Sequence, residues 1–128
     1  MNQDIGKLIL RLTLGVLILF HGANKLVNGI GWLDGMLAAH GLPAFIKYGV
    51  YVGEVVAPLL LITGFYSRIG AWLIAVNMLF ALWLVHLTQL AQINPQTGGL
   101  LIEAQYMYVL TAIALALVGP GRHAVNDR

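Results

Sequence analysis

The sequence contains no cysteine among its 128 residues. This absence excludes disulfide bonds, thiolate nucleophiles and dithiol redox chemistry within the chain, and it argues against an iron–sulfur cluster. Charged residues are also scarce, because only 9% of the chain is Asp, Glu, Lys or Arg. No basic patch with interleaved aromatic residues is present, which argues against nucleic acid as a partner.

The residues that are present are mostly apolar. Hydrophobic residues make up 59% of the chain and the mean hydropathy is +0.83, whereas an ordinary soluble domain is about 45–50% apolar and about 25% charged. A water-soluble domain this short cannot bury so much apolar surface, because small domains keep a large share of their area exposed. The composition therefore predicts a protein embedded in a lipid bilayer.

Long stretches without charge indicate where the chain crosses the bilayer. No charged residue lies between Arg68 and Glu103, and none lies in residues 104–121. A helix needs roughly 20 residues to cross a hydrocarbon core of about 30 Å. With two apolar segments nearer the N-terminus, these stretches predict an all-α membrane protein, a four-helix transmembrane bundle in a single domain. The predicted spans are residues 8–26, 48–66, 69–88 and 100–118.

The segments between the predicted spans differ in length. The tight link at Ser67-Arg68 makes the second and third spans an antiparallel hairpin, and residues 89–99 contain Asn-Pro and Gly-Gly turn signals. The link formed by residues 27–47 is longer and has apolar residues at near-helical spacing around Trp32. Because tryptophan favours the headgroup level of a membrane, this pattern favours a short interfacial helix. An ordered loop is the alternative.

Cations near the ends of the spans predict the orientation of the chain, because cytoplasmic loops are enriched in Lys and Arg. More cations lie beside the N-terminus, the turn at Arg68 and the C-terminal tail than on the opposite side, which carries Lys25 and Lys47. The distribution predicts a multi-pass protein with both termini in the cytoplasm.

Ionisable residues inside the predicted spans are the main candidates for function, because they are costly in hydrocarbon and usually face the bundle interior. At 1.5 Å per residue, the antiparallel spans bring five of them to a similar depth near one membrane face. A sixth, Arg11, lies near the other face, where it can snorkel to the headgroups or act as a counterion inside the bundle. The five candidate catalytic residues are His21, Lys25, Glu54, His86 and Glu103.

Each of these five residues also has a structural interpretation. Lys25 can extend its ammonium group to the interface, and His86 and Glu103 can touch water at the helix ends. Glu54 is harder to place without a partner, and its least costly arrangement is an ion pair with Lys25 or a hydrogen bond to His21. A shared buried network is the favoured hypothesis, and that network can be catalytic or structural.

Two cofactor chemistries fit these residue types. Haem would need His21 and His86 as axial ligands on facing helices, and no other haem signal accompanies them. A quinone needs hydrogen-bond donors for its two carbonyl oxygens, an apolar or aromatic wall and a source of protons, and the ionisable group contains both donors and acids. The candidate cofactor-binding residues are Arg11, Tyr51, Trp83 and Tyr106. Aromatic residues at such positions also serve as interfacial anchors. No metal site is predicted.

Several short motifs lie along nearly the whole chain. They are residues 11–15 (RLTLG), 21–26 (HGANKL), 41–43 (GLP), Glu54, 64–68 (GFYSR) and 119–122 (GPGR). Their order and spacing together resemble the DoxX family of small bacterial membrane proteins. The resemblance implies a four-helix bundle in the bacterial inner (plasma) membrane. It also implies a link to membrane redox complexes, because the family takes its name from a subunit of a thiosulfate:quinone oxidoreductase.

We therefore expect a redox-associated membrane subunit that binds a quinone or a similar lipid-soluble molecule at the buried polar cluster. If the chain is part of an enzyme, it is a subunit of a quinone-linked oxidoreductase. The expected partners are the lipid bilayer, a quinone, a redox partner protein and further copies of the chain. The alternatives are a small oligomeric transporter and a non-catalytic scaffold or assembly subunit.

Overall fold

The computed structural model describes residues 2–84 and 91–127. In these residues the regular elements are helical, apart from one isolated β-bridge between Ile93 and Leu100. The helices are α1 (Asn2–Asn28), α2 (Leu33–Ala39), the 3₁₀-helix η1 (Ala44–Tyr48), α3 (Gly49–Tyr51), the π-helix η2 (Val52–Val56), α4 (Ala57–Thr63), α5 (Ser67–Leu84) and α6 (Glu103–Val118).

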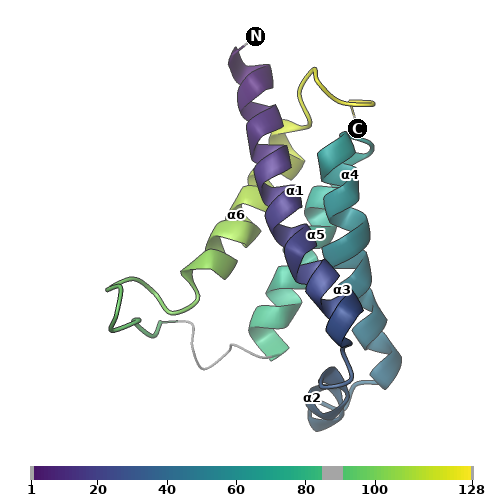
Figure 1. The fold of residues 1–128 in the computed structure, drawn as a ribbon, viewed down its shortest axis with the longest axis vertical. Helices are drawn as coiled ribbons and strands as arrows, with labels where there is room; N and C mark the ends of the chain where they lie inside the picture. The colour runs from purple at the N-terminus through teal and green to yellow at the C-terminus, as the bar shows by residue number, and fades with distance from the viewer. Residues whose placement is uncertain (1, 85–90, 128) are drawn as a thin grey trace.

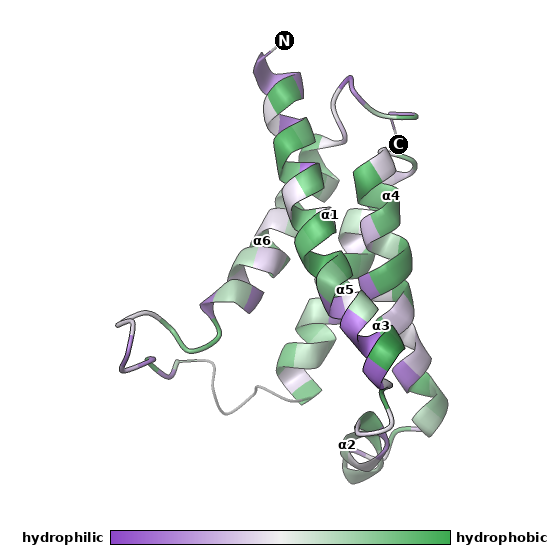
Figure 2. Ribbon diagram, viewed as in Figure 1, coloured by the Kyte–Doolittle hydropathy of each residue, from purple (hydrophilic) through white to green (hydrophobic). Residues whose placement is uncertain are grey.

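Helices α1, α4 and α5 lie side by side, with both chain termini at one end of the molecule and α2 at the other (Figure 1). Helix α1 packs against α4 and η2, while α5 packs between α4 and α6. Hydrophobic residues dominate these helices, and hydrophilic residues concentrate at the N-terminus, in the loops and in the C-terminal tail (Figure 2). This distribution is the one expected of a helical protein in lipid, and the all-α prediction is confirmed.

Three helical segments are long and apolar enough to cross a membrane, namely Asn2–Asn28, Ala44–Thr63 and Ser67–Leu84. They correspond to the first three predicted spans, although residues 85–88 of the third lie outside the described part of the chain. Helix α6 has 16 residues, which cover about 24 Å at 1.5 Å per residue. This is less than the hydrocarbon thickness of about 30 Å, so a fourth crossing stays a prediction.

The helix boundaries differ from the predicted ones for local reasons. Helix α1 begins six residues earlier than predicted, because nothing in its polar first turn breaks a helix and Asp4 complements the positive end of the helix dipole. The second span ends at Thr63, because Gly64 adopts a left-handed conformation with φ 74° and the N–H of Phe65 returns to the carbonyl of Leu60. This arrangement is a Schellman-type helix end.

The predicted interfacial helix is present as α2. Its residues Leu33 and Leu37 are buried together with Ile30 and Leu84, and these four side chains form a small apolar cluster at the end of the molecule away from the termini. Because α2 is only seven residues long, its stability depends on this packing. It covers one side of the polar site that is described next.

The main core lies between the long helices. Its fully buried side chains include Ile18 of α1, Leu61 of α4, Ile74 of α5 and Leu115 of α6. Small residues let the backbones approach closely, as at Gly70, whose added β-carbon would lie 2.9 Å from the carbonyl oxygen of Ala57. Without a hydrophobic driving force between helices in lipid, such close packing is a main source of association.

Candidate functional site

A buried ion pair joins the first two long segments. Lys25, in the last turn of α1, places its Nζ 2.6 Å and 2.7 Å from the two carboxylate oxygens of Glu54 in η2. The Glu54 side chain is only 3% exposed, whereas that of Lys25 is 22% exposed. Buried charges in proteins are usually paired, and here the cation comes from a different helix.

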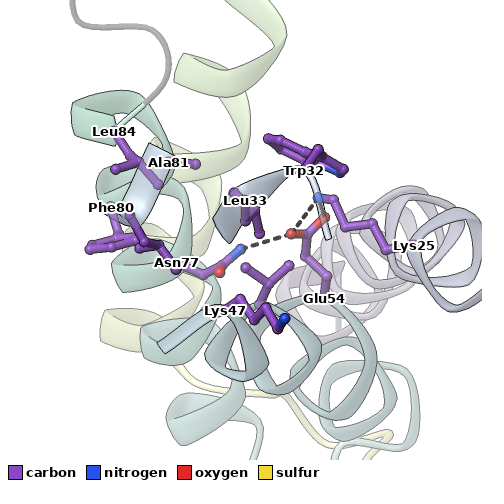
Figure 3. Close-up of a pocket in the computed structure, with 11 residues that line it drawn as sticks. Lys25, Trp32, Leu33, Lys47, Glu54, Asn77, Phe80, Ala81 and Leu84 are labelled. Atoms are coloured by element: carbon purple, nitrogen blue, oxygen red, sulfur yellow. Dashed lines mark hydrogen bonds and ion pairs between the residues drawn. The ribbon is translucent and has the colours of Figure 1, made fainter. Parts of the chain in front are cut away.

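Asn77 completes the network from a third helix. Its Nδ2 donates a hydrogen bond of 3.3 Å to Oε2 of Glu54 (Figure 3). Asn77 was not among the residues predicted from the sequence, although it is the only Asn or Gln in α5 and lies among apolar residues. Such an amide in a membrane helix usually bonds across a helix interface, and this was the signal that could have identified it.

The backbone around Glu54 is irregular because of a proline one turn later. Pro58 has no N–H group, so it cannot make the usual helical hydrogen bond to the Glu54 carbonyl. The turn just before it is π-helical, and the N–H of Ala57 bonds to the carbonyl of Val52, five residues earlier. Single π-helical turns inside helices occur frequently at functional sites. Here the irregular turn carries the buried carboxylate.

Two glycines make room for this arrangement, Gly22 in α1 and Gly53 in the π-helical turn itself. An added β-carbon at Gly22 of α1 would collide with the backbone carbonyl of Glu54. An added β-carbon at Gly53 would meet Asn77, with 2.5 Å to its Cγ and 3.0 Å to its Oδ1. The two glycines therefore allow α1 and the amide of α5 to approach the π-helical turn from two sides.

A small cavity of about 40 Å³ adjoins the network. Its polar lining comes from Lys25, Glu54, Asn77 and Lys47, and its apolar walls come from α2, α5 and Trp32 (Figure 3). Lys47 is itself held by an ion pair of 2.8 Å with Asp34. A site of this size and polarity has room for a few water molecules.

The aromatic residues predicted to bind a cofactor lie at different distances from this network. Tyr51 donates a hydrogen bond of 3.4 Å to the backbone carbonyl of Lys25. The ring centroid of Trp83 lies 4.7 Å from that of His40 and 5.9 Å from that of Phe80. Tyr106 packs against the main core. Tyr51 therefore contacts the backbone of one of the two ion-paired residues.

The other predicted ionisable residues are separate from the pair. The ring of His21 makes an edge contact with Tyr108 of α6, with centroids 5.8 Å apart, and Glu103 begins α6 beside Gly99. Among the described residues, no hydrogen bond or ion pair joins His21 or Glu103 to the Lys25–Glu54 pair. His86 lies outside the described residues, so the haem hypothesis that depends on it is untested.

Arg11 of α1 is fully buried and lies against the segment that follows α6. Its guanidinium group donates hydrogen bonds of 2.8 Å to the carbonyls of Leu61 and Pro120, and a third to the carbonyl of His123. Lys25 follows 14 residues later in α1, a rise of about 21 Å. Arg11 therefore anchors the C-terminal tail to α1 and α4, and it is not part of the cavity lining.

The chain is 31% identical to the protein named "Putative oxidoreductase CatD" of Bacillus subtilis (strain 168) over 116 residues, which are 91% of this chain and 81% of that protein. No solved structure matches. The model of the DoxX family matches residues 6–87, which include the Lys25–Glu54 pair and Asn77. The match covers more than half of the chain, and this helical membrane protein belongs to the DoxX family.

Proposed function

We propose that this protein is a redox-associated subunit that binds a quinone, or a similar lipid-soluble carbonyl compound, beside Lys25, Glu54 and Asn77. Family membership and the similarity to a protein named as an oxidoreductase support the redox association. The observation that carries the binding site is the buried network itself, because three long segments each contribute a hydrogen-bonding side chain to one cavity. Ionisable groups inside a membrane bundle mark functional sites by default.

The network has the chemistry that quinone reduction requires. Conversion of a quinone to a quinol takes up two electrons and two protons, and the electrons would come from a redox partner protein. Glu54 would take each proton from water in the cavity and pass it toward a carbonyl oxygen, while the Lys25 ammonium stabilises the carboxylate between transfers. The amide of Asn77 would donate a hydrogen bond to one carbonyl oxygen. We assign no proton relay to His21, because its ring contacts Tyr108 instead.

The size of the cavity determines where the ring lies. About 40 Å³ is too small for a quinone ring, although it suffices for water. The ring would therefore lie at the rim, against Asn77 and the aromatic side chain of Phe80, and water in the cavity would connect it to Glu54. Asn77 and Phe80 both line the cavity.

We further propose that the protein lies in the bacterial inner membrane with both termini in the cytoplasm. The N-terminus, the turn at Arg68 and the C-terminal tail share one end of the molecule (Figure 1). Their cations therefore act together in the positive-inside rule. Cysteine-accessibility labelling of single-cysteine variants in intact cells tests this, and labelling of either terminus from the outside would refute it.

Quinone binding can be tested with decylubiquinone and the protein purified in detergent. The wild type is expected to gain thermal stability as quinone is added, because a ligand that binds the folded state stabilises it. Glu54→Gln and Asn77→Leu should weaken the affinity by about tenfold, the equivalent of one lost hydrogen bond to a charged or polar group. Glu103→Gln is the matched control and should bind as the wild type does. A wild type that no quinone stabilises would refute the proposal.

A non-catalytic scaffold is the second candidate, and one observation favours it. Lys25 contacts both oxygens of Glu54, and no buried side-chain nitrogen or oxygen among the described residues lacks a hydrogen-bond partner. A network this complete can serve to fix helix register. Under this function, Glu54→Gln would lower the thermal stability and leave the redox activity of the isolated membrane complex unchanged.

A further inference from the structure

A larger groove lies beside the cavity of the Lys25–Glu54 network. It has a volume of about 320 Å³ and runs between residues 46–53 and residues 73–80 of α5. This volume is at the lower end of the range for small-molecule sites, about 300–1,000 Å³. The groove shares Val50, Asn77 and Phe80 with the small cavity, so the two spaces meet at the amide that bonds to Glu54.

Two glycines one turn apart create the groove. An added β-carbon at Gly49 would meet no atom within 4 Å, whereas one at Gly53 would meet the Asn77 side chain. Gly49 therefore leaves open space in the groove, and Gly53 leaves room for Asn77 at its inner end. At the outer edge, Val52 is 43% exposed and Val76 is 62% exposed. Both belong to membrane-spanning segments, so the groove opens toward lipid.

The chemistry of the groove walls restricts what can occupy it. Apart from the amide of Asn77, the lining side chains are apolar, and no charged residue is among them. A charged head group would lose its hydration there without compensation. A hydrocarbon chain has no hydration to lose when it moves from the bilayer into such a groove, and close packing there favours it. The groove therefore suits a chain attached to a polar carbonyl group that reaches Asn77.

We propose that this groove holds the isoprenoid tail of the quinone, which enters sideways from the bilayer and places its ring beside Asn77. The proposal rests on the quinone-binding function argued above and adds the path and the subsite for the tail. Its observational basis is the continuity of the groove with the polar cavity through one shared amide. Tail contacts in the groove then raise the affinity for long-tailed quinones above that for the ring alone.

Gly49→Leu tests this subsite, because the new side chain has space in the fold and fills the groove. The matched control is Gly6→Leu, which is also in a helix with no atom within 4 Å of an added β-carbon, but in α1 and outside the groove lining. Binding of decylubiquinone and of ubiquinone-0, which has no tail, is measured for each protein. A quinone with a photoreactive tail then identifies the residues that the tail touches.

We expect Gly49→Leu to weaken decylubiquinone binding by about tenfold, because the leucine side chain occupies the space that the tail would fill. Binding of ubiquinone-0 should be unchanged, and Gly6→Leu should change neither. Tail labelling should fall within residues 46–53 and 73–80 in the wild type. Equal binding of decylubiquinone by Gly49→Leu and wild type, or labelling elsewhere, would overturn the tail subsite and leave the ring site standing. If excess phospholipid abolishes the labelling, the groove binds lipid, and the tail subsite is overturned as well. Failure of both quinones to bind the wild type would refute the proposed function, and the tail subsite with it.

Discussion

Gly22 of α1 lies directly against the backbone carbonyl of Glu54, so closely that a β-carbon on Gly22 would collide with it. Lys25 follows three residues later on α1, which places it on a neighbouring part of the same helix surface. The contact between the two backbones thus brings the Lys25 ammonium within reach of the Glu54 carboxylate. Helix packing and the ion pair form one structural unit.

The first prediction concerns this close contact. Alanine normally favours a helix over glycine by about 1 kcal/mol, but Gly22→Ala must push α1 away from the π-helical turn. We expect the free energy of unfolding to fall by about 1–3 kcal/mol, as in other overpacked sites. Unfolding in mixed detergent micelles measures it. Gly6→Ala is the control and should not lose stability, because nothing lies near an added β-carbon there. Equal stability of Gly22→Ala and wild type would contradict the contact.

The second prediction concerns the ion pair. Lys25→Met keeps the length of the side chain but leaves the buried Glu54 carboxylate without its cation. Breaking a buried pair from one side typically costs about 3–5 kcal/mol, and we expect a loss of this order in the same unfolding assay. Lys25→Met combined with Glu54→Gln should recover most of the loss, since no unpaired charge remains. A double variant as unstable as Lys25→Met alone would show that the charge is not the cause.

Hydropathy in the sequence was sufficient to predict the helices, because lipid requires long apolar segments with internally bonded backbones. The near-helical spacing of apolar residues around Trp32 favoured a short helix between the first two spans, which is present as α2. The end of the second span was missed by three residues, because Gly64 closes the helix through its left-handed conformation. The residues at which a membrane helix begins and ends depend on local backbone conformation, as at Gly64, as well as on the thickness of the bilayer.

The candidate site was only partly predictable for a geometric reason. Counting residues along antiparallel helices gives the depth of a side chain, but not the direction in which it points around the helix. His21 and Lys25 lie one turn apart on α1, yet His21 contacts Tyr108 of α6 and Lys25 contacts Glu54. The rotation of each helix follows from packing, as at Gly22. Arg11 shows the same limit, because its partners include the C-terminal tail, a segment without periodicity.

The third prediction separates the role of Asn77 in stability from its role in binding. Asn77→Leu keeps the volume of the side chain but removes the donor to Glu54. The lost hydrogen bond is long, at 3.3 Å, so we expect the free energy of unfolding to fall by only about 1 kcal/mol. If the amide also contacts a quinone carbonyl, the variant should bind decylubiquinone about tenfold more weakly. Asn28→Leu, at the exposed end of α1, is the control. Unchanged quinone affinity in Asn77→Leu would remove the amide from the binding site.

The fourth prediction concerns Arg11 and the C-terminal tail. The three backbone carbonyls that accept from its guanidinium group belong to α4 and to the segment after α6. Arg11→Met removes all three hydrogen bonds, each worth about 1.5–3 kcal/mol as a bond to a charged group. The Leu61 carbonyl keeps the N–H of Gly64 as a donor, so the loss falls mainly on the C-terminal tail. The tail should then detach before the helices unfold, because the hydrogen bonds that remain, of 3.0–3.3 Å to Asp4 and to residues 63–66, are longer than those of Arg11. Limited trypsin digestion measures the detachment of the tail as faster cleavage after Arg122.

The control for this prediction is Asp4→Asn. Asp4 accepts one hydrogen bond from the Arg122 N–H, and an amide oxygen can still accept it. Cleavage of Arg11→Met at the rate of the wild type would show that the tail is held without the guanidinium group.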